Sequence, residues 1–355
     1  MCPLDLCAIV QANKRIIGLE RDNAVIPRVS VIVPAYNAAD FLTRALHSAL
    51  AQTMPDLELI VVDDASSDAT LALAREVAAR DPRVRVLHNE RNRGMYLTYN
   101  RAIDAARGEW IAALDADDIW LPERLERMLS VADGEDMVSD DQLLFYTSPY
   151  HRGRSKALSL LSSHGLTVTT PRRLDLLEFV EHDLGLLKPL IRGSFLRQRE
   201  LKYDADLKIG ADFFLYFEFL LAGARWLQLP NGYYLHSEHS ENTSKNTVNI
   251  AKDVAKSTET LLRHPIVAAD PALVRALERR ARDWESNEAF AVVSDLLRQR
   301  RGAEFVRLLV NEPSYLSIAL GKISRSLWRR ALWRIGGMWG QHPPASKFGP
   351  TKRGR

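Results

Sequence analysis

The chain has 355 residues, of which 46% are hydrophobic and 26% charged, close to the averages of soluble globular proteins. These values exclude a disordered or fibrous protein and leave room for one or two domains with a sizeable core. No run of about 18 uncharged apolar residues occurs, so we expect neither a membrane span nor a secretory signal. Two cysteines, Cys2 and Cys7, lie in an N-terminal extension over residues 1–27, which favours a reducing compartment.

The net charge of +3 conceals an uneven distribution. Residues 322–355 contain nine Lys and Arg and no acidic residue, so the rest of the chain carries a net −6. The excess of basic residues is therefore confined to residues 322–355. Because the acidic remainder contains no nucleic-acid recognition motif, we expect no nucleic-acid partner.

Strands and helices alternate in the first part of the chain. The β-branched run at 29–33, ended by Pro34, is typical of a buried parallel strand, and apolar residues at helical spacing follow over 41–50. The same pattern predicts strands at 57–62, 84–87 and 110–114 and helices at 71–77 and 97–106. This alternation predicts an α/β fold with a mostly parallel sheet and helices on both faces.

Polar residues follow three of the predicted strands. They are Tyr36 and Asn37, then Asp63 and Asp64, then Asp115, Asp117 and Asp118. Ligands of parallel sheets bind beyond the carboxyl ends of the strands, so we expect these groups to converge on one edge.

Three carboxylates at the end of a buried strand repel one another unless a counter-charge is present. Oxygen ligands suit Mg²⁺ or Mn²⁺, which bind one or two carboxylates and leave positions for phosphate oxygens. The sequence therefore predicts a metal site for diphosphate chemistry. Two alternatives stay open: Asp118 caps a following helix, and Tyr36 is a half-buried aromatic residue rather than a platform for a nucleobase.

The second part of the chain is less regular. Helices are predicted at 174–187 and 212–221, and the chain is helical and Arg-rich from 246 to 340. Residues 341–355 are expected to be a disordered tail.

Several spaced motifs over residues 28–129 resemble the donor domain of family 2 glycosyltransferases. They are VSVIVPAYN at 29–37, LIVVDDASSD at 59–68, NRG at 92–94 with Asn100, GEWI at 108–111 and LDADDIWL at 114–121. The resemblance implies a GT-A fold, an inverting mechanism, and a nucleotide-sugar donor, most often a UDP-sugar.

The resemblance also implies roles for individual residues. Donor-binding residues are expected at Pro34, Tyr36, Asn37, Asp64, Arg93, Gly94, Asn100, Asp115, Ala116 and Asp117. Metal ligands are expected at Asp117, Asp118 and His239. Tyr36 would stack on the base, Asp64 would bind its ring nitrogen, and Asp118 would share the metal or lie near the donor sugar. The alternative for His239 is a solvated loop histidine.

Two positions depart from the family pattern. The Glu-Asp pair that carries the catalytic base reads Ala211-Asp212, so Asp212 is the expected base, with a helix cap as the alternative. Tyr99 stands where many relatives carry Arg, so a diphosphate contact is lost or is replaced by Arg93 or Arg101.

We therefore expect a donor-binding half over 28–139, an acceptor-binding half over 140–245 and a helical C-terminal region over 246–340. Residues 187–195 (LKPLIRGSF) resemble bacterial exopolysaccharide enzymes of the succinoglycan type. The expected function is transfer of a sugar to a saccharide hydroxyl in exopolysaccharide or cell-surface polysaccharide synthesis. The alternatives are a soluble acceptor and a non-catalytic nucleotide-sugar-binding partner.

A basic amphipathic helix is predicted at 320–335, with an apolar arc opposite Lys and Arg side chains. Such a helix lies at an anionic membrane surface, which favours a lipid-linked acceptor and a cytoplasmic protein bound peripherally to the inner face of the cell membrane. The alternative is a helix that packs its apolar arc on the enzyme.

Overall fold

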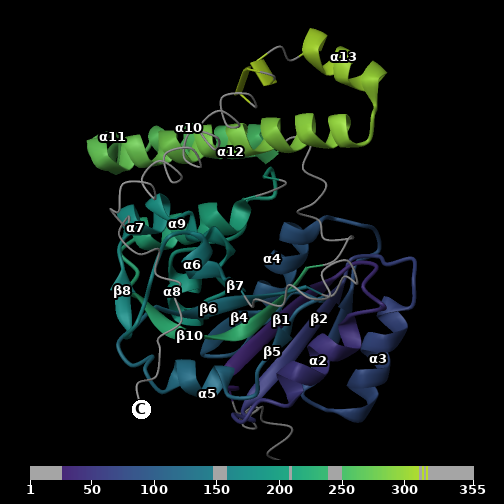
Figure 1. Cartoon of the computed structure of the whole chain (residues 1–355). Coiled ribbons are helices and arrows are strands. Elements are labelled where there is room, and N and C mark those ends of the chain that lie inside the picture. Colours follow the sequence, from purple (N-terminus) through teal and green to yellow (C-terminus); the bar gives the residue numbers. More distant parts are fainter. Residues whose placement is uncertain are drawn as a thin grey trace, which may run out of the picture. The chain divides into compact units, whose positions relative to one another are not determined.

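The computed structural model describes residues 26–146, 158–207, 210–238 and 250–311, together with 314, 315, 317 and 318 (Figure 1). The chain forms two units. The first contains the chain up to Leu174 with Leu187–Tyr203 and Phe219–Ser237, and the second contains Asp175–Leu186, Asp204–Glu218 and the chain from Glu238. The predicted boundaries of the donor-binding half, the acceptor-binding half and the C-terminal region, at residues 139 and 245, stay predictions.

A ten-stranded sheet runs in the order β3-β2-β1-β4-β9-β6-β10-β5, with β7 paired to β6 and β8 to β10. The strands are β1 (Val29–Ala35), β2 (Leu57–Asp63), β3 (Val84–His88), β4 (Trp110–Ala113), β5 (Ile119–Trp120), β6 (Met137–Tyr146), β7 (Leu158–Ser159), β8 (Arg172–Leu174), β9 (Leu190–Arg192) and β10 (Trp226–Glu238). Strands β1 to β4 are parallel, as the sequence predicts. Antiparallel pairing begins where β9 joins β4 and continues between β9 and β6 and between β10 and β5.

Strand β1 continues past the residue at which the sequence predicts its end. Pro34 lies opposite Val62 of β2, and the strand closes at Ala35. On the side of β1 that faces β4, the last hydrogen bond of the ladder runs from the Leu114 amide to the Ile32 carbonyl. Proline has no backbone N–H, and at position 34 that group would face β4. Because β4 has already ended there, Pro34 removes no hydrogen bond between the strands.

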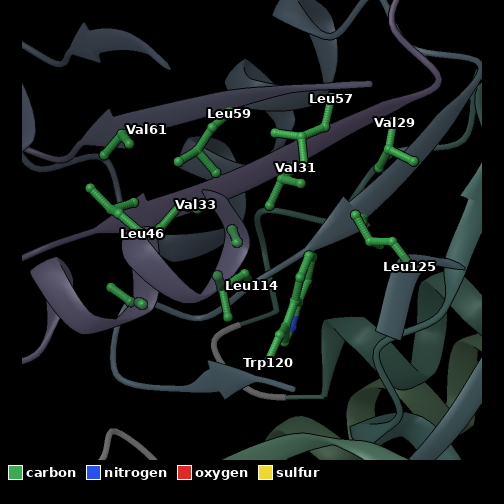
Figure 2. Close-up of a cluster of buried hydrophobic side chains, with 14 of the residues drawn as sticks. Val29, Val31, Val33, Leu46, Leu57, Leu59, Val61, Leu114, Trp120 and Leu125 are labelled. Atoms are coloured by element: carbon green, nitrogen blue, oxygen red, sulfur yellow. The ribbon is translucent and has the colours of Figure 1, made fainter. Parts of the chain in front are cut away.

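Helices cover the parallel strands. The helices of the first unit are α2 (Leu42–Leu50), α3 (Thr70–Arg80), α4 (Met95–Ala105), α5 (Arg124–Leu129), α6 (Leu160–Ser163) and α8 (Gly193–Gln198). Alternate side chains of β1 and β2, such as Val31 and Leu59, pack with Leu46 of α2 into one buried cluster (Figure 2). Trp120 and Leu125 extend the cluster toward β5 and α5 (Figure 2). This core holds the carboxyl ends of β1, β2 and β4 in place.

The second unit is helical among the described residues. It contains α7 (Leu176–Glu181), a 3₁₀ helix (Leu184–Leu186), most of α9 (Ala211–Leu221), α10 (Ile250–Leu262), α11 (Pro265–Ala268), α12 (Pro271–Arg298) and α13 (Gly302–Asn311). Helix α12 packs against α7, α10, α11 and α13. The predicted helix at 212–221 is confirmed, and the helical character of the C-terminal region is confirmed over 250–311.

The prediction of one helix at 174–187 is wrong in one respect, because the structure has two separate helices in this range. Helix α7 ends at Glu181, Asp183 adopts a positive φ of 47°, and the 3₁₀ helix follows. The carboxylate of Asp183 accepts hydrogen bonds from Arg280 and Trp284 of α12, so tertiary contacts break the helical period here. The N-terminal extension up to residue 25, the amphipathic segment at 320–335 and the tail at 341–355 lie outside the described residues. No described helix is both long and apolar enough to cross a membrane.

Candidate functional site

The polar residues that follow β1, β2 and β4 lie at one edge of the sheet. Ala35, the last residue of β1, is in register with Asp63 of β2, and the Leu114 amide after β4 donates to the Ile32 carbonyl of β1. Parallel strands in this register end side by side. Tyr36, Asp64 and the segment from Asp115 therefore leave the same edge.

Asn37 joins the loops after β1 and β2. Its φ is 47°, its amide donates to Ser66 Oγ at 3.0 Å, and its Oδ1 accepts from the Ser67 amide at 2.8 Å. The neighbouring Tyr36 is 53% exposed and presents its ring to solvent, whereas Pro34 is a strand residue. A ring with this exposure can stack on a planar ligand, and its role as a platform for a base stays a prediction.

Asp64 is buried and fixes the loop that precedes α4. Its Oδ1 accepts from Asn89 Nδ2 at 2.6 Å and from the Arg93 amide at 2.9 Å, and its Oδ2 accepts from the Gly94 amide at 2.9 Å. Gly94 has φ +88°, a value that other residues rarely adopt. A carboxylate has about four acceptor sites, so Asp64 keeps capacity for one further donor.

Asp115 is held by two side chains that are distant in the sequence. The Tyr99 hydroxyl donates to Oδ1, and the Lys188 ammonium lies 3.2 Å from Oδ2. The Asp115 amide also donates to the Tyr234 hydroxyl at 3.2 Å. Tyr99 therefore supplies a neutral hydrogen-bond donor to Asp115, and Lys188 supplies a positive charge.

This surrounding keeps Asp115 ionised. Burial alone would raise the pKa of Asp115, but the Lys188 charge and the Tyr99 hydrogen bond outweigh it, and the pKa is lowered. The pKa of the Tyr234 hydroxyl is raised well above its ordinary value, first by burial and then by the charges of Asp115 and Asp118. At neutral pH the site therefore presents an Asp115 carboxylate beside a protonated phenol.

Asp118 is buried completely and faces the end of β10. Its Oδ1 accepts from the Ser237 amide at 2.7 Å, and its Oδ2 lies 3.3 Å from His236 Nδ1. Burial acts to lower the pKa of His236, but the contact with Asp118 outweighs it and raises the pKa. Asp118 is followed by strand β5, so the alternative role as a helix cap does not apply.

The carboxylates fit the donor set that a hard cation needs. Ala116 is buried and Asp117 is partly exposed, with Asp115 and Asp118 on either side. Within the described residues, no three His, Cys, Asp or Glu side chains form a ready-made cation site. Mg²⁺ and Mn²⁺ are commonly held by one or two carboxylates with substrate phosphates completing the shell, which this segment can provide. His239 lies outside the described residues.

Asn100 and Arg101 are occupied by neighbouring backbone. Asn100 Nδ2 donates to the Tyr203 carbonyl at 2.9 Å, and its Oδ1 accepts from the Tyr203 amide at 2.9 Å. The Tyr203 ring in turn stacks on Tyr99 at 5.0 Å between ring centroids. Arg101 donates to the His88 carbonyl at 2.7 Å, so its guanidinium is tied to the end of β3. Arg93 is exposed, and its contact with a diphosphate stays a prediction.

Asp212 lies in the second unit, on the first turn of α9. Helix α9 begins at Ala211, so Asp212 is inside the helix and not the capping residue. Its side chain is partly exposed, and the adjacent Phe213 is buried. Its role as a base stays a prediction.

A buried arginine supports the residues around Asp115. Arg124 Nη2 lies 2.8 Å from Asp140 Oδ1 and donates to the Lys188 carbonyl at 2.6 Å. The guanidinium also lies over the rings of Trp120 and Tyr234, at 4.6 and 5.1 Å from their centroids. Arg124 thus orders both Lys188 and Tyr234, which contact Asp115.

We expect the variant Arg124→Met to lower the free energy of unfolding by about 3–5 kcal/mol, because it leaves the Asp140 carboxylate buried without its counter-charge. Urea unfolding measures this loss. The control is Arg80→Met, which breaks the exposed pair with Glu76 and should cost about 1 kcal/mol or less. Equal losses for the two variants would contradict the importance of the buried pair.

Sequence reasoning missed Lys188, Tyr234, His236 and Arg124. Three of them lie on strand β10 or just before β9, and β10 and β9 pair with β5 and β4, which are distant in the sequence. A lysine within the apolar stretch LLKPLI is the one signal that could have been noticed, because a buried lysine needs a carboxylate partner.

Comparisons with known proteins show which proteins this chain is similar to. Residues 30–196 match the family model described as "Glycosyl transferase family 2". The chain is 33% identical over 291 residues to the succinoglycan biosynthesis protein ExoO of Rhizobium meliloti, covering 81% of this chain and 82% of that protein. It is 32% identical over 312 residues to ExoU of the same organism, covering 83% and 86%.

Two solved structures are similar in fold. S. aureus TarS 1–349 in complex with UDP-GlcNAc superposes with a TM-score of 0.59 at 20% identity, over 75% of this chain and 81% of that one. The mannosyltransferase PcManGT from Pyrobaculum calidifontis, in complex with GDP-Man and Mn²⁺, superposes with a TM-score of 0.54 at 19% identity, over 88% and 93%.

Proposed function

Because the chain belongs to glycosyl transferase family 2 and has the GT-A fold, we propose that it transfers a sugar from a UDP-sugar to a saccharide hydroxyl with inversion. The observation that carries the proposal is the edge formed by β1, β2 and β4, from which the segments with Tyr36, Asp64 and Asp115 leave the sheet. The names of the relatives ExoO and ExoU favour exopolysaccharide or cell-surface polysaccharide synthesis as the setting.

The nucleotide of the donor would occupy the loops after β1 and β2. The exposed Tyr36 ring would stack on the base, and the remaining acceptor capacity of Asp64 would take a ring N–H. Asn37, Arg93 and Gly94 would line the same loops. Asp64 is already ordered by three hydrogen bonds, so it would bind the base without a further loss of side-chain freedom.

A divalent cation would be held by Asp117, with Asp118 and His239 as further candidates. When bound, Mg²⁺ or Mn²⁺ supplies Lewis-acid stabilisation of the departing diphosphate. The Lys188 ammonium lies 3.2 Å from the neighbouring Asp115 carboxylate and keeps it ionised, which offsets part of the negative charge of this segment. The exposed guanidinium of Arg93 would add positive charge toward the diphosphate.

Asp212 would act as the base. The acceptor oxygen attacks the anomeric carbon from the face opposite the diphosphate, and its proton passes to the Asp212 carboxylate. The new bond from this oxygen to the anomeric carbon forms as the bond to the diphosphate oxygen breaks, so one displacement inverts the configuration. The nucleotide diphosphate leaves with the bonding electrons.

A screen of purified protein with Mn²⁺ and a panel of UDP- and GDP-sugars tests the proposal by nucleotide release. We expect metal-dependent release of UDP from one donor, stimulated by a saccharide acceptor. The replacement of the usual Glu by the buried Ala211 favours a second candidate, a non-catalytic nucleotide-sugar-binding partner. UDP binding without turnover of any donor would favour that candidate.

We also propose that the acceptor is lipid-linked and that the protein binds the cytoplasmic face of the cell membrane peripherally. The support is the sequence of 320–335, which combines an apolar arc with basic residues. Because each basic residue near an anionic surface adds about 1 kcal/mol, the segment can hold the enzyme at its substrate.

Deletion of residues 322–355 should abolish sedimentation with vesicles that contain anionic lipid, while UDP release from the donor in solution is retained. The milder variant Arg329→Gln/Arg330→Gln should weaken binding by about 30-fold, from about 1 kcal/mol for each charge. Vesicles of neutral lipid are the control. If the deletion variant sediments with the vesicles as the wild-type protein does, a soluble acceptor is favoured over a lipid-linked one.

A further inference from the structure

A buried arginine of the long helix α12 contacts the residue next to the proposed base. The guanidinium carbon of Arg280 lies 3.5 Å from the centroid of the Phe213 ring. Phe213 follows Asp212 on the first turn of α9, and these residues all belong to the second unit. A guanidinium over an aromatic face is attracted by the electrons of the ring. Helix α12 therefore holds the start of α9 at the position of the base.

Two other elements hold Phe213. The Phe179 ring of α7 stacks on it with centroids 4.8 Å apart and planes 25° apart. The Phe213 ring is therefore contacted both by an aromatic ring of α7 and by the guanidinium of Arg280. A Cβ added at Gly185 would come within 2.6 Å of Phe213 Cβ and 2.8 Å of its Cα, so the 3₁₀ helix touches the backbone itself. The backbone that carries Asp212 thus has little freedom to shift.

Arg280 is itself fixed by the turn between α7 and the 3₁₀ helix. Its Nε donates to Asp183 Oδ1 at 2.6 Å, and Trp284, one helical turn later, donates from Nε1 to Asp183 Oδ2 at 2.7 Å. Asp183 has a φ of 47°, in the left-handed region. The two α12 side chains therefore secure the turn that brings Gly185 against Phe213.

Packing alone gives no reason for a charge at this position. Arg280 is 7% exposed, and its Nη1 has no hydrogen-bond partner among the described residues. A buried ion pair adds little net stability over a well-packed apolar side chain of similar volume. However, Asp183 directs the Arg280 guanidinium onto the Phe213 ring, and this contact fixes the position of the ring.

We propose that Arg280 is a positioning residue for Asp212, and that α12 acts on the proposed base through this side chain; this inference rests on the proposed function. Catalytic groups must be held within about 0.5 Å of their productive place, and a shift of about 1 Å costs as much as 100-fold in rate. Arg280, Phe179 and Gly185 together impose that restraint on the residue next to Asp212.

The variant Arg280→Met, assayed as the full chain with the donor identified by the screen, tests the proposal. We expect kcat to fall by about tenfold or more, with the donor KM and the Kd for UDP within about twofold of wild type. Arg280→Lys keeps the cation and should recover part of kcat. The matched control is Arg279→Met on the same helix, where the arginine is exposed and lies 3.7 Å from Glu181; its kcat should equal that of wild type.

The variant Trp284→Phe is the second test, and it replaces the first if Arg280→Met does not fold. It removes the N–H that binds Asp183 together with part of the indole ring, keeps an aromatic side chain, and should lower kcat by about threefold, again with unchanged KM. Equal kcat values for Arg280→Met and Arg279→Met, or an unchanged kcat for Trp284→Phe, would overturn the proposal. Failure of the proposed function would look different, because the wild-type protein would then turn over no donor.

Discussion

The variant Asp212→Asn is expected to lower kcat for sugar transfer by about 10²–10⁴-fold, the usual contribution of a general base. The amide has the size of the carboxylate but cannot accept the proton of the acceptor hydroxyl. Asp212 lies on the first turn of α9 with a partly exposed side chain, so the change leaves the helix intact. The Kd for UDP, measured by calorimetry, should equal that of wild type.

Glu218→Gln is the control for this variant. Glu218 is on the same helix, and burial, followed by the charge of Asp204, raises its pKa. Its replacement removes a carboxyl group of the second unit without touching the proposed base, so kcat should fall by less than about threefold. Wild-type kcat in Asp212→Asn would show that another group takes the proton.

The variant Asp117→Asn is expected to lower kcat by about 10²–10³-fold, because the leaving diphosphate loses electrostatic stabilisation. Asp117 is partly exposed, whereas Asp118 is buried against Ser237. The amide oxygen is a weaker ligand for a hard cation than the carboxylate. Titration with Mn²⁺ should show that UDP binding no longer strengthens as the metal is added.

Asp133→Asn is the matched control, because Asp133 is an exposed acid of the same unit. It should keep both the wild-type kcat and the metal dependence. If Asp117→Asn binds UDP with an unchanged dependence on Mn²⁺, the cation is held elsewhere and the role given to Asp117 is wrong.

The parallel half of the sheet could be predicted because its signals are local. Strands β1, β2 and β4 are short runs of mostly buried residues, and polar residues mark their carboxyl ends. Parallel pairing then brings these ends together, so Tyr36, Asp64 and Asp115 could be placed at one edge without coordinates.

The antiparallel half carries no comparable signal. Strand β5 has two residues and β9 has three, too few for a period to show. Lys188 precedes β9 and reaches Asp115 only because β9 pairs with β4. The contacts that keep Asp115 ionised therefore depend on pairing between distant segments.

The region around Asp183 shows how a tertiary contact can override a helical pattern. The apolar spacing over 174–187 predicts one helix, but the structure turns at Asp183, where α12 supplies Arg280 and Trp284 as hydrogen-bond donors. These partners lie about a hundred residues later in the chain, so no window of sequence around 183 could reveal them. The same contacts support the residue beside Asp212.

A crystal structure of the protein with UDP and Mn²⁺ tests the central claim most directly, namely that the loops after β1, β2 and β4 form one nucleotide-diphosphate site. We expect the uracil ring against Tyr36 and within hydrogen-bond distance of Asp64, and a manganese ion between Asp117 and the diphosphate. UDP bound away from this edge, or Asp117 directed into solvent with no ion beside it, would contradict the account.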